Sequence, residues 1–280
     1  MMKITDFVFP KTLEEAQKML VEYGDRGALI SGGTSLTYLK EQKTEKIAIN
    51  ISRLPLREIT QNNNEFYIGS LNVISDLRTY SAPGWELSKV AKIVSTEQIR
   101  NMTTIGGNVS KLFYWSEFPV VFLSLGARFK TTSKNVDADE FFRSQPFLSY
   151  AADEILLSIT VPKITKGTGL GFCKDVRTTA GLSTLTVSCY IKLDGDKITF
   201  VRIALGGCLT IPIRLKNVEK QLIGKIYSKS LCDSINFDEI ESFKLLPKEG
   251  MSENYCRHLI KVNIKDSMSK AVKNAKGESI

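Results

Sequence analysis

Two short segments of the sequence combine paired glycines with hydroxyl side chains, and both have the composition of an anion-binding site. The first glycine segment is SGGTS at 31–35, and the second glycine segment is TTIGGN at 103–108. Glycines permit positive φ angles and close approach of the backbone to a ligand, and free amides at a helix start favour an anion. The hydroxyls of Ser31, Thr34 and Ser35 add donors that suit phosphate oxygens. Together the segments could hold a diphosphate from opposite sides, although each alone is equally consistent with a plain glycine turn.

Other nucleotide-binding and metal-binding patterns are missing from the sequence. Neither GxGxxG nor GxxxxGK[ST] occurs, which disfavours an NAD-type Rossmann fold and a P-loop NTPase. No two cysteines are closer than sixteen residues, so no CxxC-type pair is available for zinc or an iron–sulfur cluster, and we expect no metal. Their odd number and even spacing favour buried free thiols in a reducing compartment. These cysteines are Cys173, Cys189, Cys208, Cys232 and Cys256.

His258 is the only histidine, and it limits the catalytic mechanisms open to the chain. A histidine-centred triad or a histidine metal cluster would have this one candidate at most. His258 lies in NYCRHLIKVNIKD, which has the pattern of an amphipathic helix. We therefore expect it on a helix surface and assign no catalytic residue.

Composition and charge are those of an ordinary globular protein. The chain has 280 residues, 42% of them apolar and 24% charged, and a net charge of +8 from 38 basic and 30 acidic residues. Basic residues are scattered among acidic ones, and the basic stretch 261–276 has the pattern of a solvated helix face, so nucleic acid is a disfavoured partner. The start MMKITDFVFPKT is too short and polar for a secretory signal, and no apolar run approaches a membrane span. We expect a cytoplasmic protein.

The first 55 residues have the pattern of a small α/β unit with partly parallel strands. Thr12, with Glu15 three residues later, predicts a capping box at the start of a helix that ends at Gly24. Apolar runs predict strands at 3–9, 28–30 and 47–51, and a further helix is expected at 36–42. The first glycine segment thus follows a buried strand and precedes a helix.

The rest of the chain divides near residues 163–170, where lysine, threonine and glycine crowd together. Before this point we expect strands at 66–69, 127–132 and 155–161 and helices at 74–80, 86–94 and 119–125, with the second glycine segment as a loop. After it we expect a hairpin of 182–193 and 198–205 around Asp194-Gly195, then helices at 213–223 and 252–272. The predicted fold class is α+β: a two-lobed α/β domain at 1–165, with lobes of about 1–55 and 56–165, then a smaller domain at 166–280 with an antiparallel sheet and helices on one face.

Several stretches resemble the FAD-binding subunits of the xanthine dehydrogenase and carbon monoxide dehydrogenase family of molybdenum hydroxylases. ALISGGTSLTYLKEQ resembles the family's first flavin loop, and QIRNMTTIGGNVS resembles the second, including the lead-in QIRN. The resemblance continues, in order and at matching spacing, through SEFPVVFLSLGA, ADEILLSITVP, RIALGGCLTIPIRLKNVEKQLIGK and YCRHLIKVNIKDSMSKA. It therefore covers nearly the whole chain.

The resemblance implies an electron-transfer subunit with FAD as its cofactor. In the family a molybdopterin-binding large subunit oxidises the substrate, a 2Fe-2S small subunit relays electrons, and the FAD of this subunit passes them to NAD, oxygen or a quinone. The absence of CxxC-type pairs agrees with clusters that reside on a separate chain. Two alternatives are a flavin-free structural subunit of the same fold and a stand-alone flavin oxidase. No histidine or cysteine lies near a flavin loop for covalent attachment, which argues against the oxidase.

The resemblance also implies which residues contact FAD. Glu117 would hold a ribose hydroxyl or a loop amide, or would simply be an acid at a helix start. Lys174 would lie near the flavin ring and stabilise its anionic reduced form, or would be a surface lysine. The residues implied at the diphosphate, or beside it, are Ile30, Ser31, Gly32, Gly33, Thr34, Ser35, Leu36, Thr104, Gly106, Gly107 and Asn108.

Two departures from the family pattern concern the surroundings of the flavin. Many members have small residues at 112–114, where this chain has Leu112, Phe113 and Tyr114, followed by Trp115. Many also have aspartate at the position of Leu182, which cannot accept a hydrogen bond. The usual NAD site is therefore in doubt. The aromatic residues at 113–115 either pack near the flavin or belong to the core or a subunit interface.

Overall fold

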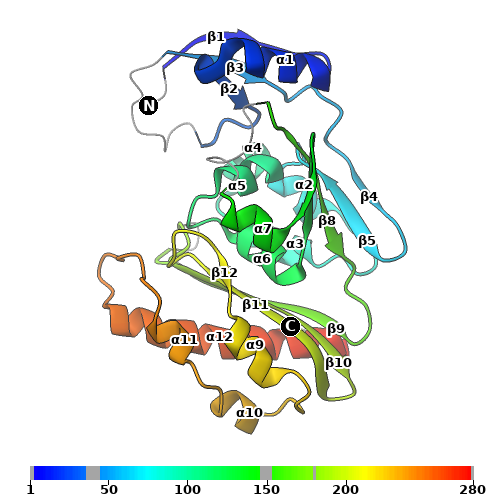
Figure 1. Ribbon diagram of the computed structural model, residues 1–280. Coiled ribbons are helices and arrows are strands. Elements are labelled where there is room, and N and C mark those ends of the chain that lie inside the picture. The colour runs from blue at the N-terminus through cyan, green and yellow to red at the C-terminus, as the bar shows by residue number, and fades with distance from the viewer. Residues whose placement is uncertain (1–2, 36–44, 146–152, 179–180, 279–280) are drawn as a thin grey trace.

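The computed structural model describes residues 3–35, 45–145, 153–178 and 181–278, and within them the chain forms three β-sheets that follow one another from the N-terminus (Figure 1). The α+β class predicted from the sequence is confirmed, with a smaller antiparallel-sheet region at the C-terminus. No helix of the described part is long and apolar enough to cross a membrane.

The N-terminal lobe is a three-stranded parallel sheet that carries one long helix. Its strands β1 (Ile4–Val8), β3 (Lys46–Asn50) and β2 (Gly27–Ile30) lie in the order β1-β3-β2. Helix α1 (Leu13–Tyr23) packs its buried Ala16 and Leu20 toward this sheet, in a cluster with Ile49, and a short 3₁₀ turn, η1 (Gly24–Arg26), follows. The predicted strands and helix of this unit are confirmed.

The capping of α1 agrees with the sequence prediction in part. The Thr12 hydroxyl accepts a hydrogen bond from the Glu15 amide at 3.2 Å, as expected of an N-cap residue. The Glu15 carboxylate, however, accepts from the amide of Lys11 at 2.6 Å rather than from that of Thr12. Thr12 and Glu15 therefore cap the helix as a pair, as predicted. The bond made by the Glu15 carboxylate, however, goes to the amide of the residue before Thr12. The helix expected at 36–42 lies outside the described residues.

The middle of the chain is a five-stranded antiparallel sheet covered by short helices (Figure 1). The strands, in spatial order, are β4 (Ile59–Gln61), β5 (Glu65–Gly69), β8 (Leu156–Pro162), β6 (Arg128–Thr131) and β7 (Asn135–Asp137). The helices are α2 (Ile74–Thr79), α3 (Leu87–Lys92), α4 (Glu97–Met102), α5 (Ile105–Lys111), α6 (Glu117–Leu125) and α7 (Ala138–Arg143). An aromatic core that includes Phe66, Phe122 and Phe129 joins this sheet to the helices.

The C-terminal part is a four-stranded antiparallel sheet with a long helix along one face. Its strands, in spatial order, are β12 (Ile213–Arg214), β11 (Lys197–Gly206), β10 (Leu185–Asp194) and β9 (Thr168–Asp175). Its helices are α9 (Lys216–Leu222), α10 (Lys229–Asp233), α11 (Asp238–Glu241) and α12 (Glu253–Lys276). The predicted hairpin is confirmed in β10 and β11.

Two predictions for the C-terminal part were wrong in detail. The stretch 213–223 was expected as one helix, but Ile213 pairs with β11 and the helix begins only at Lys216. Strand β9 was not expected, because its glycines resemble a linker. An ideal Cβ on Gly169 or Gly171 would come within 1.9 Å of a main-chain carbonyl oxygen of α12. These glycines therefore let the backbone of α12 lie directly against β9, and they do not mark a flexible segment.

Helix α6 lies between the middle and C-terminal sheets, and all nine of its residues are buried. It begins at Glu117, two residues earlier than predicted, after the N-cap residue Ser116, and Gly126 ends it at φ +65°. On the C-terminal side, the hydroxyls of Ser124 and Ser188 in β10 share a hydrogen bond of 2.7 Å. The C-terminal sheet is therefore covered on both sides: α12, a helix of the C-terminal part, lies along one face, as predicted, and α6 of the middle part packs against strands of the same sheet from the other side (Figure 1).

Candidate functional site

The two glycine segments, some seventy residues apart in sequence, are in direct contact. An ideal Cβ on Gly32 would lie 1.8 Å from the main-chain carbonyl oxygen of Met102, so only glycine permits this approach. The hydroxyl of Thr103 donates to the hydroxyl of Thr34 at 3.1 Å. The fold thus brings together the two segments on which the sequence argument rested.

The second glycine segment is not a loop, and this corrects the sequence expectation. Gly106 and Gly107 lie in the first turn of α5, which Thr104 caps by accepting from the Gly107 amide at 3.2 Å. The Ile105 and Gly106 amides donate at 2.8 Å to the carbonyl oxygens of Asn72 and Ser70. These three amides already have partners within the chain. A ligand next to α5 would therefore contact its side chains and the Cα atoms of its glycines, because these amides are not free to bind it.

The four glycines differ in what surrounds them. An ideal Cβ on Gly106 would lie 2.7 Å from the Ser70 carbonyl oxygen, so Gly106, like Gly32, is required by contact with the protein's own backbone. Gly33 has φ +69°, a conformation that favours glycine. Within the part of the chain that the structure describes, an ideal Cβ on Gly107 would have one neighbour within 4 Å, the Thr104 hydroxyl at 3.0 Å. Among the described residues, Gly107 is therefore the glycine of the second segment beside which a side chain would have the most space.

Three buried polar atoms have no hydrogen-bond partner within the described part of the chain: Asn108 Oδ1 on α5, Ser70 Oγ beside α5, and Arg100 Nε on α4. The Asn108 amide nitrogen donates weakly to the Ser116 hydroxyl at 3.5 Å, and the Arg100 guanidinium donates to the carbonyl oxygens of Val94 and Ser95. Buried polar atoms normally have partners, so unpaired ones indicate a ligand or an ordered water. A ligand rich in hydroxyls fits Ser70 Oγ and Asn108 Oδ1.

Ser70 and Arg100 had not been assigned a role from the sequence. Arg100 was noted only as part of the QIRN lead-in, and Ser70 follows strand β5 in a segment without any glycine pair or motif. Ser70 becomes relevant because its carbonyl oxygen receives the Gly106 amide and places its hydroxyl beside α5. No local sequence signal predicts this contact.

Glu117 and Lys174, which the sequence analysis treated separately, form one ion pair. Lys174 Nζ lies 2.7 Å from Glu117 Oε1, and the two side chains are only 4% and 7% exposed. Lys174 also donates to the Ile93 carbonyl oxygen at 3.1 Å. Burial raises the pKa of Glu117, and the charge and hydrogen bond of Lys174 oppose that rise. Lys174 is therefore not a surface lysine, and Glu117 is both a helix-start acid and the partner of a buried cation.

The aromatic residues at 113–115 form a cluster at the surface and do not belong to the described core. The rings of Phe113 and Trp115 are stacked, with centroids 4.6 Å apart, and Tyr114 is 40% exposed. Lys248 Nζ lies 4.3 Å from the centre of the Tyr114 ring, in cation–π geometry. Leu182 is also exposed, at 51%. Ordinary core packing therefore does not account for these residues.

The remaining candidate residues are placed as follows. Ile30 is buried at the end of β2, where its carbonyl oxygen accepts from the Ile51 amide at 2.9 Å. Ser31 and Ser35 are half-buried next to the glycines, and Leu36 lies outside the described residues. The five cysteines are free and buried, and His258 is exposed on α12, both as predicted. Among the described residues no group of three His, Cys, Asp or Glu side chains could hold a metal.

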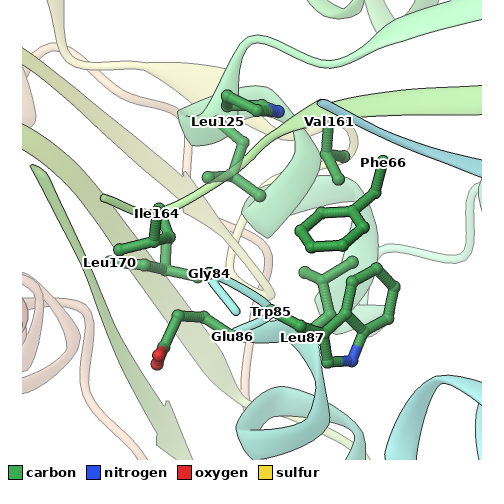
Figure 2. A pocket seen from close by; sticks show the side chains of 10 residues that line it. Phe66, Gly84, Trp85, Glu86, Leu87, Leu125, Val161, Ile164 and Leu170 are labelled. Atoms are coloured by element: carbon green, nitrogen blue, oxygen red, sulfur yellow. The ribbon is translucent and has the colours of Figure 1, made fainter. Parts of the chain in front are cut away.

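A small apolar cavity lies elsewhere, between β5, β8 and the start of α3 (Figure 2). The rings of Phe66 and Trp85 line it on one side, and Leu125 and Leu170 line it on the other (Figure 2). Its volume of about 10 Å³ is enough for one water molecule at most. It is therefore a packing defect of the core and does not compete with the glycine segments as a ligand site.

Two family matches cover almost the whole chain. Residues 2–164 match the FAD binding domain in molybdopterin dehydrogenase, and residues 172–271 match the CO dehydrogenase flavoprotein C-terminal domain. The chain is 28% identical over 232 residues to the carbon monoxide dehydrogenase medium chain of Hydrogenophaga pseudoflava, covering 79% of this chain and 80% of that one. It is 25% identical over 282 residues to the 6-hydroxypseudooxynicotine dehydrogenase complex subunit alpha of Paenarthrobacter nicotinovorans, covering 97% and 95%.

A solved structure has the same fold. It is the carbon monoxide dehydrogenase from Hydrogenophaga pseudoflava that lacks the Mo-pyranopterin moiety of the molybdenum cofactor. The TM-score is 0.90 at 24% identity, and the alignment covers 98% of this chain and 99% of the other. The likeness therefore extends over both the glycine segments and the C-terminal sheet.

Proposed function

The chain belongs to the family of FAD-binding domains in molybdopterin dehydrogenases, and on that premise we propose that it is the electron-transfer subunit of a molybdenum hydroxylase. In this proposal it takes electrons from iron–sulfur clusters on a partner subunit and passes them, through its FAD, to an acceptor. FAD is the cofactor of the family, and when bound it supplies two-electron chemistry that can also proceed in single-electron steps.

The observation that carries the proposal is the contact between the two glycine segments. Because Gly32 packs on Met102 and Thr34 bonds Thr103, both segments border one site. We propose that Gly33, Thr34 and Ser35 bind the FAD diphosphate on one side, with Gly32, Ser31 and Ile30 shaping the turn. Leu36 stays a proposed neighbour of the same site.

On the other side, we propose that Thr104, Gly107 and Asn108 contact the cofactor, while Gly106 sets the position of α5. Asn108 Oδ1, which has no partner in the described part of the chain, is an acceptor, so it suits a ribose or ribityl hydroxyl better than a phosphate oxygen. Ser70 Oγ, which also has no partner among the described residues, can both donate and accept there.

We propose that Glu117 and Lys174 act on the flavin as a pair. Because Glu117 neutralises most of the Lys174 charge at 2.7 Å, the pair would stabilise a reduced anionic ring less than an isolated lysine would. Its main contribution would be to fix the position of β9 relative to α6 beside the cofactor.

The proposed partners are a molybdopterin-binding large subunit and a 2Fe-2S small subunit. Relatives that support this include proteins named caffeine dehydrogenase subunit beta and nicotinate dehydrogenase FAD-subunit, which are components of larger enzymes by name. The lack of CxxC-type pairs agrees with clusters held elsewhere. The exposed Tyr114 and Leu182 are proposed to face either the flavin or a partner subunit.

The acceptor is proposed to be NAD, oxygen or a quinone. Leu182 offers no hydrogen-bond acceptor at a position where the family resemblance implies aspartate, which argues against NAD. Reduced enzyme should be mixed with NAD, oxygen and a quinone analogue in parallel, and the rate of flavin reoxidation recorded for each. Reoxidation by NAD at a rate equal to or above the others would overturn the argument from Leu182.

The purified protein itself tests the function. We expect a yellow protein with a flavin absorption spectrum that releases FAD on denaturation and co-purifies with the two partner chains. A colourless protein that takes up no added FAD would favour the flavin-free structural subunit. A yellow protein that oxidises a small substrate without partner chains would favour the stand-alone oxidase.

A further inference from the structure

Lys248 is a half-buried cation that forms no ion pair among the residues that the structure describes. Its Nζ donates to the Gly207 carbonyl oxygen at 2.6 Å and lies 4.3 Å from the centre of the Tyr114 ring. Partial burial removes water from the ammonium group and lowers its pKa. Lys248 therefore differs from Lys174, whose charge is opposed by Glu117 at 2.7 Å.

Backbone contacts hold Lys248 and Tyr114 next to each other. The Leu246 amide donates to the Cys208 carbonyl oxygen at 2.8 Å, which attaches the segment before α12 to the end of β11. At the same turn, the Gly207 amide donates to the Tyr114 carbonyl oxygen at 3.0 Å. Tyr114 stays 40% exposed even with the lysine against its ring. This turn thus presents a cation and an aromatic ring together at the surface.

The segment that carries Tyr114 lies next to the side chains proposed to bind FAD. Leu112 ends α5 in the left-handed conformation, at φ +50°, and the Ser116 hydroxyl then accepts from the Asn108 amide nitrogen at 3.5 Å. Helix α5 has seven residues and is roughly 10 Å long, which is comparable to the length of the five-carbon ribityl chain of FAD. A cofactor whose diphosphate lies at Gly107, as proposed above, can therefore place one of its two ring systems beside Tyr114.

Charge favours the flavin ring over the adenine ring beside Tyr114. Reduced flavin carries a negative charge, whereas adenine is neutral in both redox states, so only the flavin gains from a nearby cation when it is reduced. Glu117, whose pair with Lys174 is proposed to act on the flavin, follows Tyr114 by three residues. That pair contributes little net charge, so a cation without a carboxylate partner among the described residues, such as Lys248, has the larger effect.

We propose that Tyr114 packs against the flavin ring and holds Lys248 where its charge stabilises the reduced, anionic flavin. The inference rests on the proposed function, because it requires FAD at the two glycine segments. It assigns Tyr114 to the flavin rather than to a partner subunit. It also makes Lys248 a residue that raises the reduction potential of the cofactor, so that FAD accepts electrons more readily.

The test is the two-electron reduction potential of the FAD in the purified protein, measured against redox dyes by flavin absorbance. Lys248→Met should weaken the binding of reduced relative to oxidised FAD at least about threefold, which lowers the potential by about 14 mV. Lys248→Arg, which keeps the charge, should stay close to the unmodified protein. Lys244→Met is the matched control, because it removes the same charge from an exposed side chain four residues earlier.

Flavin fluorescence tests the contact with Tyr114. A tyrosine ring packed on the flavin quenches its fluorescence, so Tyr114→Leu should brighten the bound FAD. The same variant should lower the reduction potential in the direction of Lys248→Met, because the lysine loses the ring that holds it. Melting temperature and FAD content per chain confirm that each variant is folded and loaded, and Lys248→Gln serves if the methionine variant is not.

The outcomes separate this inference from the proposed function. A purified chain that binds no FAD contradicts the proposed function, and the inference with it. Bound FAD with the same potential in Lys248→Met and Lys244→Met overturns the inference alone. Equal loss of affinity for oxidised and reduced FAD in Tyr114→Leu, with unchanged fluorescence, would place the adenine beside Tyr114 and overturn the inference as well.

Discussion

The two glycine segments have similar sequences but are built differently. In the first, Gly32 and Gly33 make a turn with a positive φ at Gly33. In the second, Gly106 and Gly107 belong to a helix capped by Thr104. In each pair, one glycine, Gly32 or Gly106, packs on the protein's own backbone, and the other, Gly33 or Gly107, is the one that we propose contacts the ligand. A glycine pair in a binding motif therefore has two separate requirements, close packing of the backbone at one glycine and space for a ligand at the other. Substitutions at the two positions should affect stability and FAD binding differently.

The largest effect is expected from Gly32→Ala. The added Cβ would lie 1.8 Å from the Met102 carbonyl oxygen, and neither group is a side chain that can rotate away. Overpacking of this kind costs about 1–3 kcal/mol and occasionally more, and we expect the upper end together with loss of FAD. Urea unfolding and the flavin absorbance of the purified variant measure the two effects. Full FAD content with unchanged stability would mean that neither folding nor FAD binding depends on the contact between Gly32 and Met102.

A smaller loss of stability is expected from Gly106→Ala. Its Cβ would meet the Ser70 carbonyl oxygen at 2.7 Å and the Ser70 Cβ at 2.8 Å, a shallower overlap than at Gly32. The better helix propensity of alanine, worth up to about 1 kcal/mol, offsets part of the cost. We expect a net destabilisation of about 1–2 kcal/mol in urea unfolding of the FAD-free protein. A stabilised variant would contradict the role assigned to this glycine.

The adjacent substitution Gly107→Ala should weaken FAD binding while leaving the stability of the fold nearly unchanged. Of the described residues, its Cβ would approach the Thr104 hydroxyl alone, at 3.0 Å, so stability should stay within about 1 kcal/mol of the original. If Gly107 faces FAD, the Kd should rise at least about tenfold, measured by fluorescence titration of the apoprotein. Gly106→Ala is the matched control, one residue away in the same helix. An unchanged Kd would remove Gly107 from the cofactor contacts.

The smallest effect is expected from Lys111, at the end of the helix that carries the second segment. Burial lowers its pKa to about 8, from the ordinary value of 10.5. The unfolded chain then binds more protons than the folded one between these two values, so this residue makes stability rise as pH increases through that window. Lys111→Met should remove this increase of stability with pH. The increase is small because the lysine side chain is partly exposed. Urea unfolding at pH 7, 8, 9 and 10 measures the difference.

The sequence predicted the elements whose cause is local. Thr12 before a helical repeat and Asp194-Gly195 between two apolar runs are signals contained within a few residues, whereas the second glycine segment was expected as a loop and forms the start of α5. Strand β9 was missed because its glycines are explained only by α12, about a hundred residues away in the sequence. The pairing of Glu117 with Lys174 and the unpaired Ser70 hydroxyl depend on three-dimensional contact in the same way. FAD-contact assignments for individual residues stay predictions, as does the domain boundary near 165.

The buried helix α6 has a consequence for how the chain can be divided. Its residues contribute to the core of the middle sheet, yet its Ser124 bonds the C-terminal sheet, and Gly206 packs against its Val120. A chain truncated near residue 165 would leave this apolar helix facing water on one side. The two family segments are therefore not interchangeable modules, and an exchange of C-terminal halves between related subunits would have to carry over the matching surface of α6.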